Sequence, residues 1–333
     1  ISTTPGLTRK PKPKPKPVPV SKPTVPTKMY DPVPTPVLHS TEYLRSITSA
    51  KEWLDLDYDT ITDPGNSEIR QVTSASGEQF ILKKPPSSDI NASSPSIQRE
   101  IDTMQEMISN NLGDLVPKIV YASRESEPTL LVMEKSGDSP RNSTLEGRVS
   151  DFSGESKMQF LMDLASTINE MHSGGPGYVH RDIKPANITV STIDEPPDCE
   201  FHGLIDFGLA IRLNKLQGTH LGISDFFGHP SHAPNSTNSK KNRSHEGQDW
   251  FAYARVAASL IVGESGAVLK QYLEGNLMDD KIERGILSLP EGSRRDAILE
   301  IAMYTLTFDT QGEAESVKGL DRLKELAEKI VQG

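Results

Sequence analysis

Between residues 41 and 137 the spacing of hydrophobic positions changes period several times. Helical spacing over residues 41–56 predicts a helix, and alternation of apolar with polar residues from residue 61 onward then predicts strands. The remaining segments with a clear period are a helix over 97–112, stopped by Gly113, and strands over 118–122 and 129–133. This stretch therefore reads as a small antiparallel sheet with one helix in it and another helix outside it.

After residue 138 the pattern is mostly helical. Apolar residues recur every three or four positions over residues 157–171, 248–262, 266–273, 294–306 and 316–331. The fold class expected for the whole chain is α+β, with residues 41–137 forming the sheet-bearing part and residues 138–333 the larger helical part.

Residues 1–40 form a tail of different composition. They hold eleven of the 25 prolines, including an alternating Lys-Pro run over residues 10–17, and seven Lys or Arg residues against the single acid Asp31. Such a segment cannot form a core and favours an extended, disordered polyproline-II spacer. Two other readings stay open, a tether to an anionic surface and a ligand for a proline-binding module.

The charge balance and cysteine content limit the possible partners and the compartment. The net charge of −10 leaves an acidic body, which argues against nucleic acid as a partner because phosphate backbones need clustered Lys and Arg. Cys199 is the single cysteine, so the chain needs no oxidising compartment. No apolar run approaches the length of a membrane span. We therefore expect a cytoplasmic protein, although the start at Ile1 leaves open a leader that is missing here.

Two strings of residues carry the candidate chemistry. Residues 180–187 read H-R-D-I-K-P-A-N, and residues 206–208 read D-F-G. Together they resemble the eukaryotic-type Ser/Thr protein kinase family, over roughly residues 57–310. This resemblance implies a bilobal fold, with a small antiparallel β lobe and a larger α-helical lobe, and it implies ATP and Mg²⁺ as cofactors.

The resemblance assigns a role to each polar residue of the two strings. Asp182 would orient the attacking hydroxyl and accept its proton, and Lys184 would reach the transferred phosphate. Asn187 and Asp206 would ligate magnesium. A lysine at position 184 is typical of Ser/Thr-specific members, and Arg181 before the aspartate favours a protein kinase over aminoglycoside-type relatives.

Two further charged residues are expected near the phosphates. Lys83 ends a predicted strand and would contact the α- and β-phosphates, paired with Glu100 of the helix over residues 97–112. Lys84 is adjacent, so a shift of one residue is the alternative. For Glu100 the alternative is an ordinary solvent-facing charge on the helix.

The glycine-rich loop over the phosphates is the weakest match. The family pattern G-x-G-x-x-G-x-V fits only at Gly65 and Val72, with Ser67 and Arg70 in place of two glycines. Glycines let backbone amides approach phosphate closely. We expect Arg70 to supply a phosphate contact by its charge instead.

The resemblance also places an adenine site, which departs from the usual pattern. Ile81 would cover the base in place of alanine, and Thr189 would lie beneath it in place of an apolar residue. Met133 would stand at the back of the site. Glu134 and Lys135 would begin the connection between the lobes, whose backbone would bond the adenine edge.

The segment after D-F-G is atypical. Arg181 could dock a phosphorylated Thr219 or Ser224, or could instead pair with backbone or with an acid. Asn235 stands where the family has the glutamate of A-P-E. Asp249 matches the helix-opening aspartate that holds the catalytic loop from behind.

These residues lead to the expectation of a magnesium- and ATP-dependent Ser/Thr protein kinase that acts on protein substrates and on itself. Filled catalytic positions beside altered structural ones resemble bacterial effector kinases, which would imply secretion into a host cell. Two alternatives stay open. One is a pseudokinase-like binding module, and the other is a kinase-fold transferase that moves AMP or acts on a small molecule.

Overall fold

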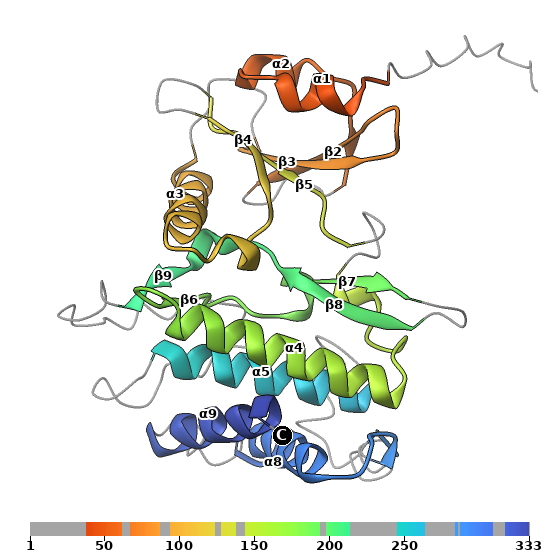
Figure 1. Ribbon diagram of the computed structural model, residues 1–333, viewed down its shortest axis with the longest axis vertical. Coiled ribbons are helices and arrows are strands. Elements are labelled where there is room, and N and C mark those ends of the chain that lie inside the picture. The colour runs from red at the N-terminus through yellow and green to blue at the C-terminus, as the bar shows by residue number, and fades with distance from the viewer. Residues whose placement is uncertain are drawn as a thin grey trace, which may run out of the picture. The chain divides into compact units, whose positions relative to one another are not determined.

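A computed structural model gives the fold of the chain (Figure 1). It describes residues 38–61, 67–86, 94–123, 128–137, 144–193, 198–213, 245–263, 284–285, 287–308 and 317–332. All of these residues belong to one unit, Leu38–Gly333. The predicted spacer over residues 1–40 lies almost wholly outside them and stays a prediction.

Five strands form an antiparallel sheet in the order β1-β2-β3-β5-β4 (Figure 1). Its strands are β1 (Asp59–Thr60), β2 (Glu68–Thr73), β3 (Gln79–Lys84), β4 (Ile119–Ala122) and β5 (Leu131–Glu134). One long helix, α3 (Pro95–Ser109), comes between β3 and β4 in the chain. The predicted α+β class, with a small antiparallel sheet and one helix, is confirmed.

The two faces of this sheet bury different residues, because successive side chains of a strand point to opposite sides. Phe80 and Leu82 of β3 belong to a core cluster that also contains Trp53. Ile81, between them in sequence, packs against the main core, and Lys83 follows on the same side. We call these the Trp53 face and the Lys83 face.

Two short helices cover the Trp53 face, α1 (Thr41–Ser46) and α2 (Ala50–Leu54). The Trp53 ring lies 6.0 Å from the Phe80 ring. The prediction of one continuous helix over residues 41–56 is wrong at Ile47, where the backbone becomes extended. Ser49 then caps α2 by accepting a hydrogen bond from the Glu52 N–H, and serine favours such a cap over a helix interior.

Helix α3 begins and ends with local signals. Its N-cap is Ser94, and Pro95 occupies the first turn, where the missing N–H costs nothing. The helix ends at Ser109, earlier than the predicted end at residue 112, because Asn111 adopts a left-handed conformation (φ 62°). Asparagine tolerates that conformation better than most residues do.

The main core lies among four long helices, α4 (Gly154–Ser173), α5 (His245–Val262), α8 (Ser293–Phe308) and α9 (Val317–Gln332). Every residue of α5 from 247 to 262 is buried, and α4, α8 and α9 pack around it (Figure 1). The predicted helix over residues 266–273 lies outside the described residues. Across the described ranges, no helix has both the length and the apolar character needed to cross a membrane.

Two antiparallel strand pairs lie between the sheet and these helices (Figure 1). Strand β7 (Ile188–Thr192) pairs with β8 (Cys199–Leu204), and β6 (Tyr178–Val179) pairs with β9 (Ile211–Arg212). Cys199 is buried. The segments that join these strands carry the residues 180–187 and 206–208 singled out above, so the pairing positions the candidate chemistry.

Asp198 joins the β7–β8 pair to the start of α4. Its Oδ1 accepts hydrogen bonds from the backbone N–H groups of Ser153 (3.1 Å) and Cys199 (2.9 Å), and the Ser156 hydroxyl donates to Oδ2. Partial burial pushes the pKa of Asp198 upward, but these hydrogen bonds outweigh it and hold the pKa below its ordinary value.

Asp198→Asn should therefore destabilise the protein in a pH-dependent way. A carboxylate whose pKa is lowered by folding contributes stability above its unfolded pKa of 3.8 and loses that contribution as the pH falls through the folded value. Urea unfolding should show a lower midpoint for the variant at pH 7, and the difference should shrink below about pH 4. Asp163→Asn, at the surface of α4, is the control. A difference that is constant with pH would contradict this role.

Candidate active site

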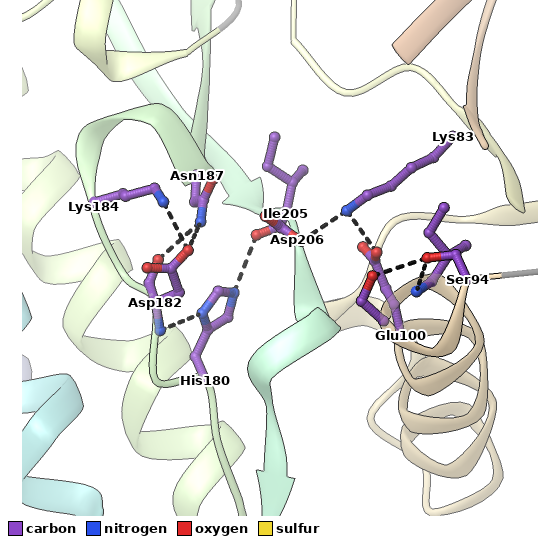
Figure 2. A network of polar contacts seen from close by, with 11 residues as sticks. Lys83, Ser94, Glu100, His180, Asp182, Lys184, Asn187, Ile205 and Asp206 are labelled. Carbon is purple, nitrogen blue, oxygen red and sulfur yellow. Dashed lines mark hydrogen bonds and ion pairs between the residues drawn. The ribbon is translucent and has the colours of Figure 1, made fainter. Parts of the chain in front are cut away.

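The Lys83 ammonium lies between two carboxylates from different parts of the fold (Figure 2). Its Nζ is 2.7 Å from Glu100 Oε2 in α3 and 2.7 Å from Asp206 Oδ1, which follows β8. Lys84 instead pairs with Glu68 Oε2 at 2.7 Å, and adjacent strand residues point to opposite faces. The structure thus brings Lys83, not Lys84, to Glu100.

Burial and pairing set the charges of this group. Burial lowers the pKa of the Lys83 amine, but the Glu100 and Asp206 carboxylates outweigh it and raise the pKa above its ordinary value. Burial disfavours the charged form of Glu100 as well, and it raises the pKa of this carboxyl, whose side chain is 2% exposed. For Asp206 the Lys83 ammonium outweighs burial, and the pKa is lowered. Lys83 and Asp206 therefore both carry their charge at neutral pH.

The backbone at Asp206 holds its carboxylate in place. Asp206 adopts a left-handed conformation (φ 66°), and the next side chain, Phe207, is fully buried. The Phe207 ring lies 4.8 Å from the His180 ring. Phe207 shares the main core with Met104 of α3, and Ile119 of β4 packs against that core. The packing of Phe207 thus connects the sheet, α3 and the segment after β8.

Asp182, Lys184 and Asn187 form a second polar group (Figure 2). The Lys184 ammonium and the Asn187 amide nitrogen each lie 2.8 Å from Asp182 Oδ2. The Asn187 amide nitrogen also donates to the Asp182 backbone carbonyl at 2.9 Å. Because the amide nitrogen faces Asp182, the amide oxygen of Asn187 points away from it.

His180 links this group to the segment that bears Asp206. The Asp182 N–H donates to His180 Nδ1 (3.3 Å), and His180 Nε2 lies 3.1 Å from the Ile205 carbonyl oxygen. These two contacts fit the tautomer in which Nδ1 accepts and Nε2 donates.

Asp249 of α5 supports the loop over residues 180–187 from within the core. Its fully buried carboxylate accepts hydrogen bonds from the backbone N–H groups of His180 and Arg181, both at 2.8 Å. His172 Nε2 lies 2.9 Å from the same carboxylate. Arg181 holds a left-handed backbone conformation (φ 69°), which these bonds help to impose.

The oxygen donors fit a magnesium–nucleotide complex. Mg²⁺ prefers carboxylate and carbonyl oxygens, and the Asp206 carboxylate and the Asn187 amide oxygen are both of that kind. Over the ranges that the structure describes, no cluster of three or more His, Cys, Asp or Glu residues could hold a metal ion.

Two of the residues expected over the phosphates, Arg70 and Val72, lie on the Trp53 face of the sheet. Gly65 falls outside the described residues. Arg70 and Val72 alternate with Gln71 along β2, and Val72 packs in the Trp53-face core. The Arg70 guanidinium pairs with Glu68 and lies 3.6 Å from the centre of the Tyr58 ring. This geometry argues against the expected nucleotide contacts of Arg70 and Val72, because both side chains point away from Lys83.

The residues expected around adenine divide between the two faces of the sheet. Ile81 and Met133 lie opposite each other on β3 and β5, on the Lys83 face. The Glu134 side chain lies on the other face, where its Oε1 is 2.9 Å from Arg45 and 2.8 Å from Lys118.

The backbone amides of residues 134 and 135 are already engaged. The Glu134 N–H donates to the Lys118 carbonyl and the Lys135 N–H to the Gln79 carbonyl, each at 2.9 Å. Donors to a nucleobase edge would therefore have to come from later residues.

Thr189 lies at the connection between the sheet and the helical part. Its hydroxyl is within hydrogen-bond distance of the Gly203 carbonyl oxygen (3.1 Å) and of the Ser136 hydroxyl (3.2 Å). Thr219, Ser224 and Asn235 fall outside the described residues, so the expected activation segment stays a prediction.

Sequence reasoning missed two residues near this site, His172 and Gln71. His172 lies 77 positions before Asp249, and nothing in the local pattern links them. Gln71 was missed because the glycine-rich pattern was aligned to end at Val72. The sequence of β2 alone does not decide which of its residues shares the face of Lys83.

Asp249→Asn should loosen the loop over residues 180–187. Asparagine has one acceptor oxygen, so at least one of the buried N–H groups of His180 and Arg181 loses its partner, at a cost of about 1–3 kcal/mol per group. We expect a lower unfolding midpoint in urea and faster amide exchange at residues 180–182. The surface variant Asp102→Asn should change neither, and unchanged exchange in Asp249→Asn would contradict the supporting role.

Comparison with known proteins places this site in a family. The Citron Rho-interacting kinases of Mus musculus and Homo sapiens are 28% identical to the chain over 178 and 179 residues, and the Citron rho-interacting kinase of Rattus norvegicus is 26% identical over 201 residues. These alignments cover 50%, 50% and 57% of this chain but only 8%, 8% and 9% of the relatives. A model described as "Protein kinase domain" matches residues 64–289, which is more than half of the chain, and the chain therefore belongs to the protein kinase domain family.

Proposed function

We propose that this protein transfers the γ-phosphate of ATP to Ser or Thr hydroxyls of protein substrates. The observation that carries the proposal is the Lys83 ammonium, held 2.7 Å from both Glu100 and Asp206. Phosphoryl transfer depends on positioning and on charge stabilisation, and this arrangement fixes a cation and a metal-binding carboxylate side by side.

Asp182 is the proposed group that acts on the substrate hydroxyl. Its Oδ2 accepts hydrogen bonds from Lys184 and Asn187, which fix the orientation of the carboxylate. The carboxylate would then orient the hydroxyl and accept its proton as the oxygen attacks phosphorus. Lys184 would offset the negative charge that develops on the transferred phosphoryl group.

Asn187 and Asp206 are the proposed magnesium ligands, through the amide oxygen and a carboxylate oxygen. When bound, the ion would neutralise charge on the β- and γ-phosphates. Lys83 would orient the nucleotide phosphates by its charge. Glu100 would hold Lys83 in place, because an ammonium with a buried carboxylate partner has little freedom to move.

Specificity for Ser and Thr, and autophosphorylation, are part of the proposal. Lys184, two positions after Asp182, supports the first, as in the Ser/Thr members that the sequence resembles. We further propose residues 41–137 and 138–333 as the two lobes and residues 1–40 as a spacer. The acidic body favours basic peptide segments over nucleic acid as substrates.

Asp182→Asn should slow phosphoryl transfer strongly and leave nucleotide binding largely intact. A positioned general base contributes about 10²- to 10⁴-fold, so a loss of that size is expected in the rate of phosphate incorporation from radiolabelled ATP. Asp163→Asn, on α4, should retain the wild-type rate.

Intact-mass analysis of the product separates the possible reactions. An added phosphate supports the proposal, whereas an added AMP identifies a different transferase. Equal incorporation by wild type and Asp182→Asn would contradict the role of Asp182. No turnover by wild type with any protein substrate would favour a binding module.

A further inference from the structure

The Lys83 face carries a polar residue where an apolar one is expected. In the β2–β3 pairing Gln71 lies directly opposite Ile81, and Ile69 lies opposite Lys83. Residues directly opposite each other in an antiparallel pair point to the same face. Gln71 therefore shares the face of Ile81 and Lys83, while Val72 packs on the other side of the sheet.

The Gln71 side chain is buried and incompletely hydrogen-bonded. The residue is 5% exposed, and its Nε2 donates to the Thr73 hydroxyl at 3.3 Å. Its amide oxygen, Oε1, is buried and has no hydrogen-bond partner among the residues that the structure describes. Native proteins pair nearly all such atoms, and an unpaired one calls for an explanation such as a functional role.

Its position limits which part of a nucleotide it can meet. Ile81 and Lys83 are two positions apart along β3, a rise of about 6.6 Å. Gln71 lies opposite Ile81, so along the strand direction it is offset from Lys83 by about the same distance. An amide oxygen is an acceptor and cannot pair with a phosphate oxygen, so its partner has to be a donor. If the phosphates lie at Lys83, the donor belongs to the nucleoside.

We propose that Gln71 is a specificity-determining residue whose amide oxygen accepts a hydrogen bond from the nucleoside of the bound nucleotide. The donor is either the exocyclic amine of the purine or a ribose hydroxyl, which are the donors that adenosine offers. The proposal rests on the proposed function, because it takes ATP as the nucleotide bound at Lys83.

The test compares three nucleotides on the full chain, wild type beside Gln71→Leu, by calorimetric titration. ATP carries both kinds of donor, 2′,3′-dideoxy-ATP lacks both ribose hydroxyls, and purine riboside triphosphate lacks the exocyclic amine. Wild type should bind one of the two analogues about three- to tenfold more weakly than ATP, the range of one neutral hydrogen bond. Gln71→Leu should bind ATP weaker by a similar factor and should lose that discrimination.

Thermal unfolding supplies a second readout. Without nucleotide, Gln71→Leu should melt no lower than wild type, because removing an unpaired buried acceptor offsets the loss of the long 3.3 Å hydrogen bond to Thr73. With saturating ATP the variant should gain less stability than wild type, since stabilisation by a ligand follows its affinity. Gln159→Leu, exposed on α4, is the matched control and should behave as wild type in both assays.

The two proposals fail in different ways. If wild type binds ATP and both analogues with affinities within twofold of each other, the role of Gln71 is overturned without any variant. Unchanged discrimination in Gln71→Leu overturns it as well, while the proposed function stands. If wild type binds none of the three nucleotides, the proposed function fails and this inference fails with it.

Discussion

The site depends on one buried cation held between two acids. Lys83 is only 12% exposed, and a buried charge is stable only when it is paired and hydrogen-bonded. Its partners stand on α3 and on the segment after β8, so the pairing holds three separate elements in one arrangement. Removing either carboxylate would leave the buried Lys83 ammonium with one partner. It would also break the contact between β3 and the element that carried the removed residue.

A second buried carboxylate, that of Asp249, positions the part of the site that carries Asp182. Asp249 lies in the buried part of α5, residues 247–262, and accepts hydrogen bonds from two consecutive backbone N–H groups of the loop over residues 180–187. Because α5 is packed in the core, these hydrogen bonds fix the backbone at His180 and Arg181. They thereby fix the position of Asp182, the next residue. His180 joins the halves by bonding Asp182 on one side and Ile205, next to Asp206, on the other.

Continuous motifs were predictable from sequence, and pairings between distant segments were not. Asp182, Lys184 and Asn187 lie within six residues, so their spacing alone limits their geometry. Strand register has no such local signal, and a slip of one residue moves a side chain to the other face. That is why Val72 was expected where Gln71 stands. The break between α1 and α2 was missed because apolar spacing continues across Ile47, while Ser49 supplies a cap.

The most direct test incubates the protein with magnesium and ATP, wild type beside Lys83→Ala and Lys83→Met, and maps the phosphorylated residues by mass spectrometry. Lys118→Ala, at the edge of the sheet, is the control, and circular dichroism checks folding. The account predicts phosphate on Ser or Thr residues with wild type and the control, and none above background with either Lys83 variant. Incorporation by a folded Lys83 variant at the wild-type rate would contradict it.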